Sequence, residues 1–92
     1  MLSRSDRTQA AIVKELRARY YSVLVVSHLH LGFDIILGWR GKTYLFEIKN
    51  HDDPPSKKKL TKNEHEFKDT WRGHLRTVET VEEIIMDLEG KF

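Results

Sequence analysis

The sequence predicts a single domain of the α/β class, of the α+β kind with a mixed sheet. Its predicted element order is α-β-β-β-α-β-α. Three observations support this prediction. The 92 residues show no shift in composition that would mark a domain boundary. Two strand-like runs in the middle of the chain flank a short glycine-containing segment. Helical patterns with capping residues precede and follow this pair of strands.

The chain opens with a predicted helix, which Ser3 or Ser5 can cap. Apolar residues recur behind this cap at helical spacing, at Ala10, Ile12, Val13, Leu16 and Tyr20. Val23 to Val26 is a short β-branched run and predicts a strand. Residues 28–32 then form a connection to the next strand.

Residues 33–37 and 43–48 are two strand-like runs and predict a hairpin. If Arg40 and Gly41 form a two-residue turn, Trp39 pairs with Lys42. Counting outward from that pair places Asp34 directly opposite Glu47. Their Cβ atoms would then be about 5 Å apart.

The second half of the chain begins with an irregular loop, because Pro54-Pro55 removes backbone donors. Thr61 and Glu64 form a capping box, which opens a helix on which Trp71 is expected to anchor the core. Gly73 is expected to end this helix in a left-handed conformation. The pattern of residues 75–78 predicts a last strand, and a second capping box from Thr80 to Glu83 is expected to open a final helix.

Asp34, Glu47 and Lys49 are the candidate catalytic residues. Glu47 and Lys49 share one strand face, and two carboxylates placed opposite each other repel unless a cation lies between them. Mg²⁺ or Mn²⁺ suits such a pair, because hard ions prefer oxygen ligands, and the backbone carbonyl of Ile48 is a further candidate ligand. Lys49 can orient a water or neutralise phosphoryl charge. The structural alternative is a strand start at Asp34 and a solvated sheet face at Glu47 and Lys49.

At these positions the chain resembles the PD-(D/E)XK nucleases, specifically the small phage and bacterial VRR-NUC type. The resemblance rests on Gly32-Phe33-Asp34, on Gly38 and Gly41, and on Phe46-Glu47-Ile48-Lys49. It extends over nearly the whole chain. It implies a restriction-endonuclease-like αβββαβ core, here with an extra C-terminal helix, and a metal-dependent DNA endonuclease. Branched DNA such as a Holliday junction is the substrate suggested by analogy, and the resemblance also implies a homodimer.

The chain departs from the family pattern at two positions. Phe33 stands where a proline often precedes the first aspartate, and Glu64 stands where a glutamine is common. An acidic residue of the first helix faces the metal in many relatives. Asp6, Gln9 and Glu15 compete for this position here, and Gln9 matches the motif best.

Basic residues cluster just after the candidate site, at Lys57, Lys58, Lys59 and Lys62. They are candidate contacts for DNA phosphates, although such loops are often only solvated. The formal net charge is only +2, so this local cluster of lysines is a stronger indication of a polyanionic partner than the total charge. His28-x-His30 suggests a transition-metal site, but the carboxylate pair favours Mg²⁺ or Mn²⁺.

Composition narrows the remaining possibilities. The chain contains no cysteine and no long apolar stretch, so we expect a soluble cytoplasmic protein of a bacterial or phage-infected cell, without an organic cofactor. The apolar residues Ile84, Ile85, Met86 and Leu88 exceed what a small core needs and suggest a dimer surface. A non-catalytic nucleic-acid-binding module, a structural protein that binds a cation for stability, and an RNA substrate remain alternatives.

Overall fold

The computed structural model describes residues 4–50 and 61–90 of the chain, and it describes side chains from Arg7 onward. The cluster Lys57, Lys58 and Lys59, the paired prolines and the proposed cap Ser3 lie outside the described residues. The side chain of Asp6 is also not described.

Three α-helices, one short 3₁₀ helix and four strands make up the described fold. In chain order they are α1 (Arg4–Ala18), β1 (Ser22–Val25), η1 (Ser27–Leu29), β2 (Ile35–Trp39), β3 (Lys42–Ile48), α3 (Lys62–Thr70), β4 (Arg76–Val78) and α4 (Val81–Glu89). The strands form one sheet in the order β1-β2-β3-β4. The β1–β2 and β2–β3 pairs are antiparallel and the β3–β4 pair is parallel. The mixed α+β class and the predicted element order are therefore confirmed.

The hairpin of β2 and β3 has the predicted register. Trp39 pairs with Lys42, and Ile35 pairs with Phe46 at the other end. Arg40 and Gly41 both have positive φ, at 52° and 75°. A two-residue turn with two left-handed residues matches the right-handed twist of the strands, which explains the glycine at its second position.

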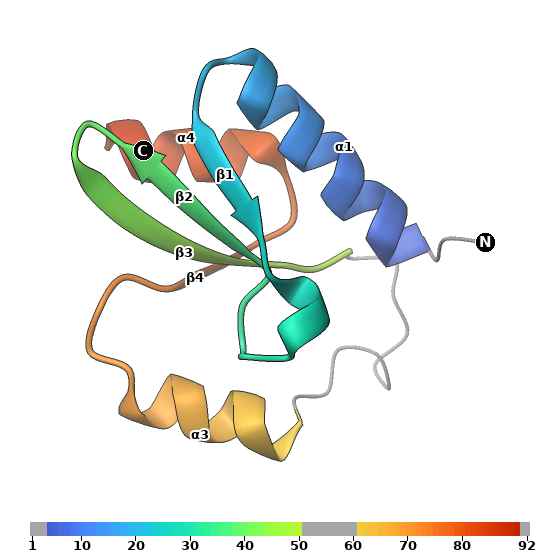
Figure 1. Cartoon of the computed structure of the whole chain (residues 1–92), viewed down its shortest axis with the longest axis vertical. Coiled ribbons are helices and arrows are strands. Elements are labelled where there is room, and N and C mark those ends of the chain that lie inside the picture. The colour runs from blue at the N-terminus through green and yellow to red at the C-terminus, as the bar shows by residue number, and fades with distance from the viewer. Residues whose placement is uncertain (1–3, 51–60, 91–92) are drawn as a thin grey trace.

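The core lies between one face of the sheet and the two helices α1 and α4 (Figure 1). Side chains of β2 and β3 alternate, so Ile35, Leu37, Phe46 and Ile48 point to these helices and are buried. Helix α1 contributes Ile12, Val13 and Leu16, and α4 contributes Val81, Ile84 and Leu88. The catalytic candidate Glu47 lies on the opposite face of the sheet.

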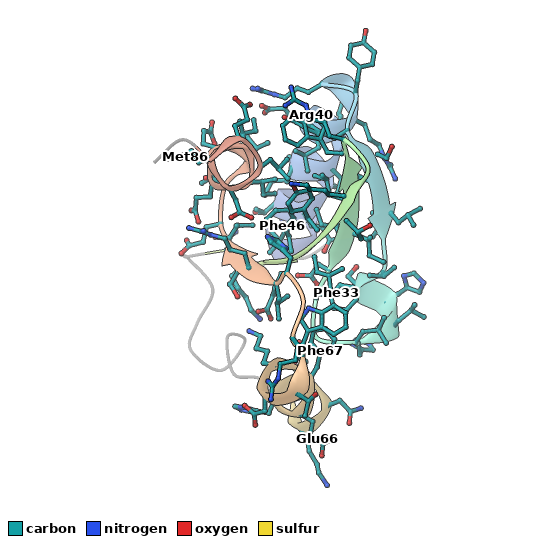
Figure 2. The ribbon with its side chains drawn as sticks, turned by 90° about the vertical axis from the view of Figure 1, so that its left-hand side faces the viewer. Phe33, Arg40, Phe46, Glu66, Phe67 and Met86 are labelled. Carbon is teal, nitrogen blue, oxygen red and sulfur yellow. The ribbon has the colours of Figure 1, made fainter. Side chains whose placement is uncertain are left out.

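Helix α3 lies beyond the end of the sheet that is remote from the hairpin turn (Figure 1). It has no buried residue. Phe67 joins it to the sheet by packing against Phe33, with ring centroids 5.2 Å apart (Figure 2). Gly32 makes this approach possible, because a Cβ there would lie 3.0 Å from the Phe67 ring. The capping box of Thr61 and Glu64 begins the helix as predicted.

Several local predictions for these helices are wrong. Trp71 is 43% exposed and stacks on Phe67 instead of anchoring the core. Helix α3 ends at Thr70, with Trp71 as an extended C-cap, so Gly73 is not the left-handed stop. Gly73 is needed for space, because a Cβ there would lie 2.7 Å from the Trp71 ring. Tyr20 follows α1 and is 95% exposed.

The apolar residues of α4 are mostly used within the chain itself. Ile84 and Leu88 are buried, and Ile85 packs against the core. Only Met86 of the four is exposed, and it lies on the outer side of α4 (Figure 2). The reason is that α4 covers a sheet face, so its surplus of apolar residues gives no ground for a dimer surface. No helix within residues 4–50 and 61–90 has the length and apolar character needed to cross a membrane.

Candidate active site

The end of the sheet beside α3 brings the candidate catalytic residues together. Glu47 lies near the end of β3, and Lys49 follows directly after that strand. Asp34 lies one residue before β2. Phe46 and Ile48 on either side of Glu47 are in the core, so strand alternation turns the Glu47 side chain to the other face. The predicted grouping of Glu47 with Lys49 is confirmed by a distance of 3.4 Å between Lys49 Nζ and Glu47 Oε2.

Asp34 is held by three hydrogen bonds at the point where the β2–β3 ladder ends. Its backbone N–H donates to Phe46 O and its carbonyl accepts from Val26 N, each at 2.9 Å. Asp34 and Ile35 thus both face Phe46, which is the arrangement of a β-bulge. The expected one-to-one pairing of Asp34 with Glu47 is therefore not part of the ladder. The carboxylate instead reaches the end of β3, where its Oδ2 accepts from Ile48 N at 2.7 Å.

Glu47 is the one buried charged residue in the described part of the chain, with 2% exposure. Its Oε1 accepts hydrogen bonds from Lys68 Nζ on α3 and from Thr77 Oγ1 on β4, the latter at 3.0 Å. Its Oε2 is buried and has no hydrogen-bond partner among the described residues. Lys49 approaches this oxygen at ion-pair distance only. Because an unsatisfied buried carboxylate oxygen is costly, it marks a place where a further group can bind.

The charges at this site act on one another. Burial raises the pKa of Asp34, and the nearby Glu47 charge adds to this effect. The hydrogen bond from Ile48 N and the charge of Lys49 oppose it only in part. The pKa of Glu64 is lowered, because hydrogen bonds from Thr61 and the charges of Lys49 and Lys68 outweigh its partial burial.

Two of the three acidic or amide candidates on α1 can be placed. Gln9 Nε2 donates to Ser27 Oγ at 3.0 Å, so its amide group is directed to η1. Glu15 pairs with Arg19 at 2.8 Å on the exposed surface of the helix. The first turns of α1 are nevertheless close to the site, because Asn50 Nδ2 donates to Thr8 Oγ1 at 3.0 Å. A role of Gln9 at the metal stays a prediction.

The side chains partly match the requirements of a divalent cation. The free Oε2 of Glu47 is a suitable ligand atom, and Asp34 uses only Oδ2 in hydrogen bonding to the described residues. Residues 4–50 and 61–90 contain no group of three or more His, Asp or Glu side chains that could hold a metal ion. Mg²⁺ commonly uses only one or two carboxylates and completes its coordination with water and phosphate. Two carboxylates therefore suffice, and Ile48 carbonyl ligation stays a prediction.

Sequence reasoning missed Lys68 and Thr77, which both contact Glu47. The spacing of α3 contains a signal for Lys68. Glu64, Phe67 and Lys68 recur at helical intervals and share one face of α3. Phe67 directs this face to the sheet, so a lysine on it has to reach a buried partner. Thr77 is aligned with Glu47 only through the parallel β3–β4 register, which the sequence does not reveal.

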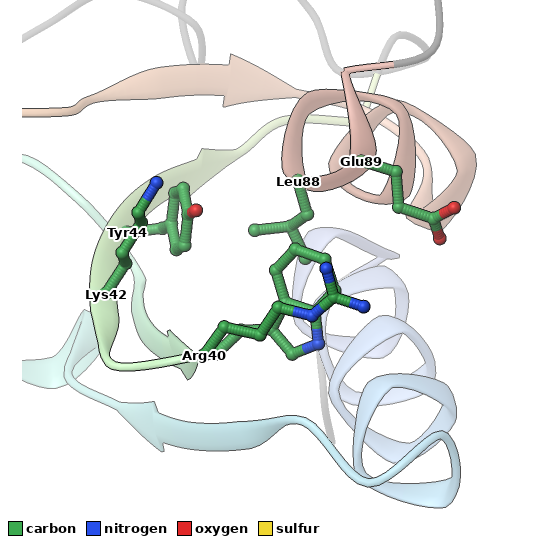
Figure 3. Close-up of a pocket in the computed structure, with 6 residues that line it drawn as sticks. Arg40, Lys42, Tyr44, Leu88 and Glu89 are labelled. Carbon is green, nitrogen blue, oxygen red and sulfur yellow. The ribbon is translucent and has the colours of Figure 1, made fainter.

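A separate pocket lies between the hairpin turn and the end of α4 (Figure 3). It is lined by Trp39, Arg40, Lys42, Tyr44, Leu88 and Glu89. Trp39 is partly exposed at the turn, and the Arg40 guanidinium lies 4.3 Å from its ring centre. Tyr44 stacks on Phe46, so the pocket belongs to the helix-covered side of the sheet and not to the face of Glu47.

The histidines of the described chain form no metal site. His28 and His30 are exposed in and after η1. His74 has a structural role, because its Nδ1 accepts from Leu45 N at 3.1 Å and its Nε2 lies 2.6 Å from Asp87 Oδ2. His74 precedes β4 in the chain, and its two ring nitrogens connect β3 to α4.

Comparisons of the chain with protein-family models, with curated proteins and with solved structures find no significant match. The residues of the site therefore define its chemistry. These are two carboxylates, Asp34 and Glu47, two ammonium groups, Lys49 and Lys68, and one buried carboxylate oxygen without a hydrogen bond.

Proposed function

We propose that this chain is a Mg²⁺- or Mn²⁺-dependent endonuclease of the PD-(D/E)XK class, similar to the VRR-NUC type. The observation that carries the proposal is the buried Oε2 of Glu47, which has no hydrogen-bond partner among the described residues. It lies beside Lys49, at the end of the sheet where Asp34 is also held. A carboxylate oxygen left in this state is costly in a purely structural sheet, and a cation removes the cost.

Asp34 and Glu47 would hold the cation. When bound, the ion supplies a water of lowered pKa and stabilises negative charge on phosphoryl oxygens. The chain's own residues have defined tasks around it. The Ile48 N–H fixes the Asp34 carboxylate through Oδ2, and Thr77 fixes Glu47 through Oε1. Lys49, with a 23% exposed side chain, carries an ammonium that can reach both Glu47 and a phosphate from solvent.

We propose DNA as the substrate, bound by its backbone and shape. The described chain offers α3 beside the site, with Lys62 exposed in its first turn. Lys57, Lys58 and Lys59 precede this helix in the sequence. Cations of this kind contact phosphates without reading bases, so low sequence specificity follows. A preference for branched DNA such as a Holliday junction, and a homodimer with paired sites, rest on the resemblance alone.

The test is cleavage of labelled four-way-junction, flap, duplex and single-stranded DNA, and of matched RNA, with Mg²⁺, Mn²⁺ or EDTA. Wild type is compared with Glu47→Gln and Lys49→Met, which keep the size of the side chains. Matched controls are Glu82→Gln and Lys14→Met at exposed positions of α4 and α1. We expect the site variants to lose at least about 100-fold of the rate, as positioned charge stabilisation predicts, and the controls to keep it.

A second candidate function is a non-catalytic nucleic-acid-binding module on the same fold. The observation in its favour is Lys68, because Lys49 and Lys68 both form ion pairs with Glu47 and compensate its charge without any metal. This module would bind DNA equally well in EDTA and would cleave none of the substrates. Metal-dependent cleavage that Glu47→Gln abolishes would exclude it.

A further inference from the structure

Lys68 occupies the carboxylate that the proposed metal needs. Its Nζ forms an ion pair with Glu47 Oε1 at very short range, and its side chain is 26% exposed against 2% for Glu47. Thr77 Oγ1 donates to the same oxygen. The two oxygens of Glu47 therefore differ: Oε1 is saturated by protein donors, while Oε2 has none among the described residues.

The charge balance at the site works against a cation as long as Lys68 stays in place. Asp34 and Glu47 carry two negative charges, Lys49 and Lys68 carry two positive charges, and the Glu64 carboxylate interacts electrostatically with both lysines. A divalent ion added to this group would make it net positive and would place two ammonium groups beside the ion at a buried carboxylate. Charges of like sign within a few ångströms repel strongly where water is excluded. Removing one ammonium from Glu47 relieves the repulsion directly.

Lys68 is attached in a way that allows this removal. Helix α3 has no buried residue and packs on the segment before β2 through the Phe33–Phe67 ring contact. This contact does not involve Lys68. Its flexible four-carbon side chain can turn toward solvent while α3 stays in place. Only the ion pair with Glu47 has to break.

We infer that Lys68 is a resident counterion of Glu47 and that a divalent cation binds at Asp34 and Glu47 only in exchange for it. This inference rests on the proposed function. Once displaced, the Lys68 ammonium points to solvent beside the site, where it can form an ion pair with a DNA phosphate. If bound DNA pairs with Lys68 in place of Glu47, it favours metal binding at Glu47. By thermodynamic linkage, bound metal then favours DNA binding by the same free energy. The site therefore takes up metal mainly together with its substrate.

The test measures Mn²⁺ affinity without DNA at pH 8, from the electron paramagnetic resonance signal of free Mn²⁺. Lys68→Met removes the charge and keeps the side-chain volume. We expect it to bind Mn²⁺ at least about tenfold more tightly than wild type. Lys62→Met removes the same charge from the first turn of α3 and should leave the affinity within about twofold. The double variant Lys68→Met, Glu47→Gln should lose the gain.

Two further measurements keep the inference falsifiable if Lys68→Met folds poorly. Lys68→Arg retains the charge and should bind Mn²⁺ no more tightly than wild type. In wild type, the amine NMR resonance assigned to Lys68 should shift on addition of diamagnetic Mg²⁺, while that of exposed Lys14 should not. Circular dichroism and thermal melting check that each variant is folded.

The outcomes separate this inference from the proposed function. If wild type binds Mn²⁺ and Lys68→Met binds it equally or more weakly, the inference is overturned and the nuclease proposal stands. If neither protein binds Mn²⁺ without DNA, the inference is overturned, and if neither binds it with DNA present either, the nuclease proposal is overturned too. In a second arm, a non-cleavable phosphorothioate duplex should tighten Mn²⁺ binding in wild type and have less effect in Lys68→Met. An equal effect in both proteins would show that Lys68 does not couple metal binding to DNA binding.

Discussion

Glu47 has an environment that a structural residue would rarely keep. It is 2% exposed, and one of its oxygens lacks a hydrogen bond among the described residues. Leaving such an atom unsatisfied costs about 1–3 kcal/mol or more for a charged group. Replacement of a whole buried ion pair by apolar residues is often neutral or stabilising for a protein. The cost is therefore consistent with a carboxylate kept for binding, and Lys49 and Lys68 supply its compensation in the absence of metal.

Asp34 should destabilise the fold at neutral pH. Its native pKa is raised above the ordinary value of 3.8, chiefly by burial, so the native state binds more protons than the unfolded state just above that pH. Stability then falls as pH rises through this window. Asp34→Asn removes the titration and keeps an oxygen that can accept from Ile48 N. We expect this variant to be more stable than wild type at pH 7.5 in EDTA.

The measurement is urea denaturation at pH 3.5 and pH 7.5. The stability advantage of Asp34→Asn should be small at pH 3.5, where the wild-type carboxyl is mostly protonated in both states, and larger at pH 7.5. An exposed control such as Asp69→Asn should show no comparable change. A wild type that is as stable as Asp34→Asn at both pH values would show that burial of this carboxyl has no net cost.

The residues of the site differ in how well the sequence reveals them. Glu47 and Lys49 follow from strand periodicity, because two charged residues leave an apolar strand on one side. The exact setting of Asp34 does not follow, since a bulge at the end of a ladder has no strong sequence pattern. Lys68 comes from a helix that is far away in sequence, and its contact with Glu47 depends on how α3 docks.

At the scale of elements, local signals predicted starts better than ends. The capping box at Thr61 and the hairpin turn at Arg40-Gly41 appear as expected, because each depends on residues within four positions. The predicted end of α3 at Gly73 is wrong, because the backbone already becomes extended at Trp71, which has a φ of −70° and a ψ of 130°. In the sequence, the apolar residues of α4 form a surplus that suggests a dimer surface. Most of them instead cover a face of the sheet, and the spacing along the helix does not reveal how wide that contact is.

The hairpin turn offers a matched pair of glycine substitutions. Gly41 has a φ of 75°, which an L-residue adopts at a cost of about 1–2 kcal/mol. A Cβ there meets nothing within 4 Å, so the backbone alone sets the effect. Gly38 lies in β2 without positive φ, and a Cβ there would be 3.6 Å from Ser22 Cβ, which is an ordinary contact. Gly41→Ala should therefore destabilise the protein, and Gly38→Ala should not.

Thermal melting distinguishes these two variants. For a domain of this size, we expect Gly41→Ala to lower the Tm by roughly 4–8 °C per kcal/mol. Gly38→Ala should leave the Tm unchanged or raise it, because alanine restricts the unfolded chain. Equal losses in both variants would indicate that the hairpin turn does not adopt the left-handed conformation at Gly41.

For the whole molecule, the distribution of charge matters more than its sum. A formal net charge of +2 gives little general attraction for DNA. The sequence nevertheless concentrates Lys57, Lys58 and Lys59 directly before α3, the helix that carries Lys62 and Lys68 beside the candidate site. If the proposed function holds, the phosphate contacts should come from this region and not from the molecule as a whole.

The salt dependence of DNA binding tests this distribution. Each phosphate neutralised on duplex DNA contributes about −0.9 to the slope of log K against log salt. In a Glu47→Gln background, which prevents cleavage, replacing Lys57, Lys58 and Lys59 by alanine should reduce the magnitude of the slope by up to about 2.7. The control replaces three exposed residues and removes the same charge: Lys14 on α1, Arg19 just after α1, and Lys42 at the hairpin. If both triple variants lose the same slope, net charge governs DNA binding and the lysine cluster has no special role.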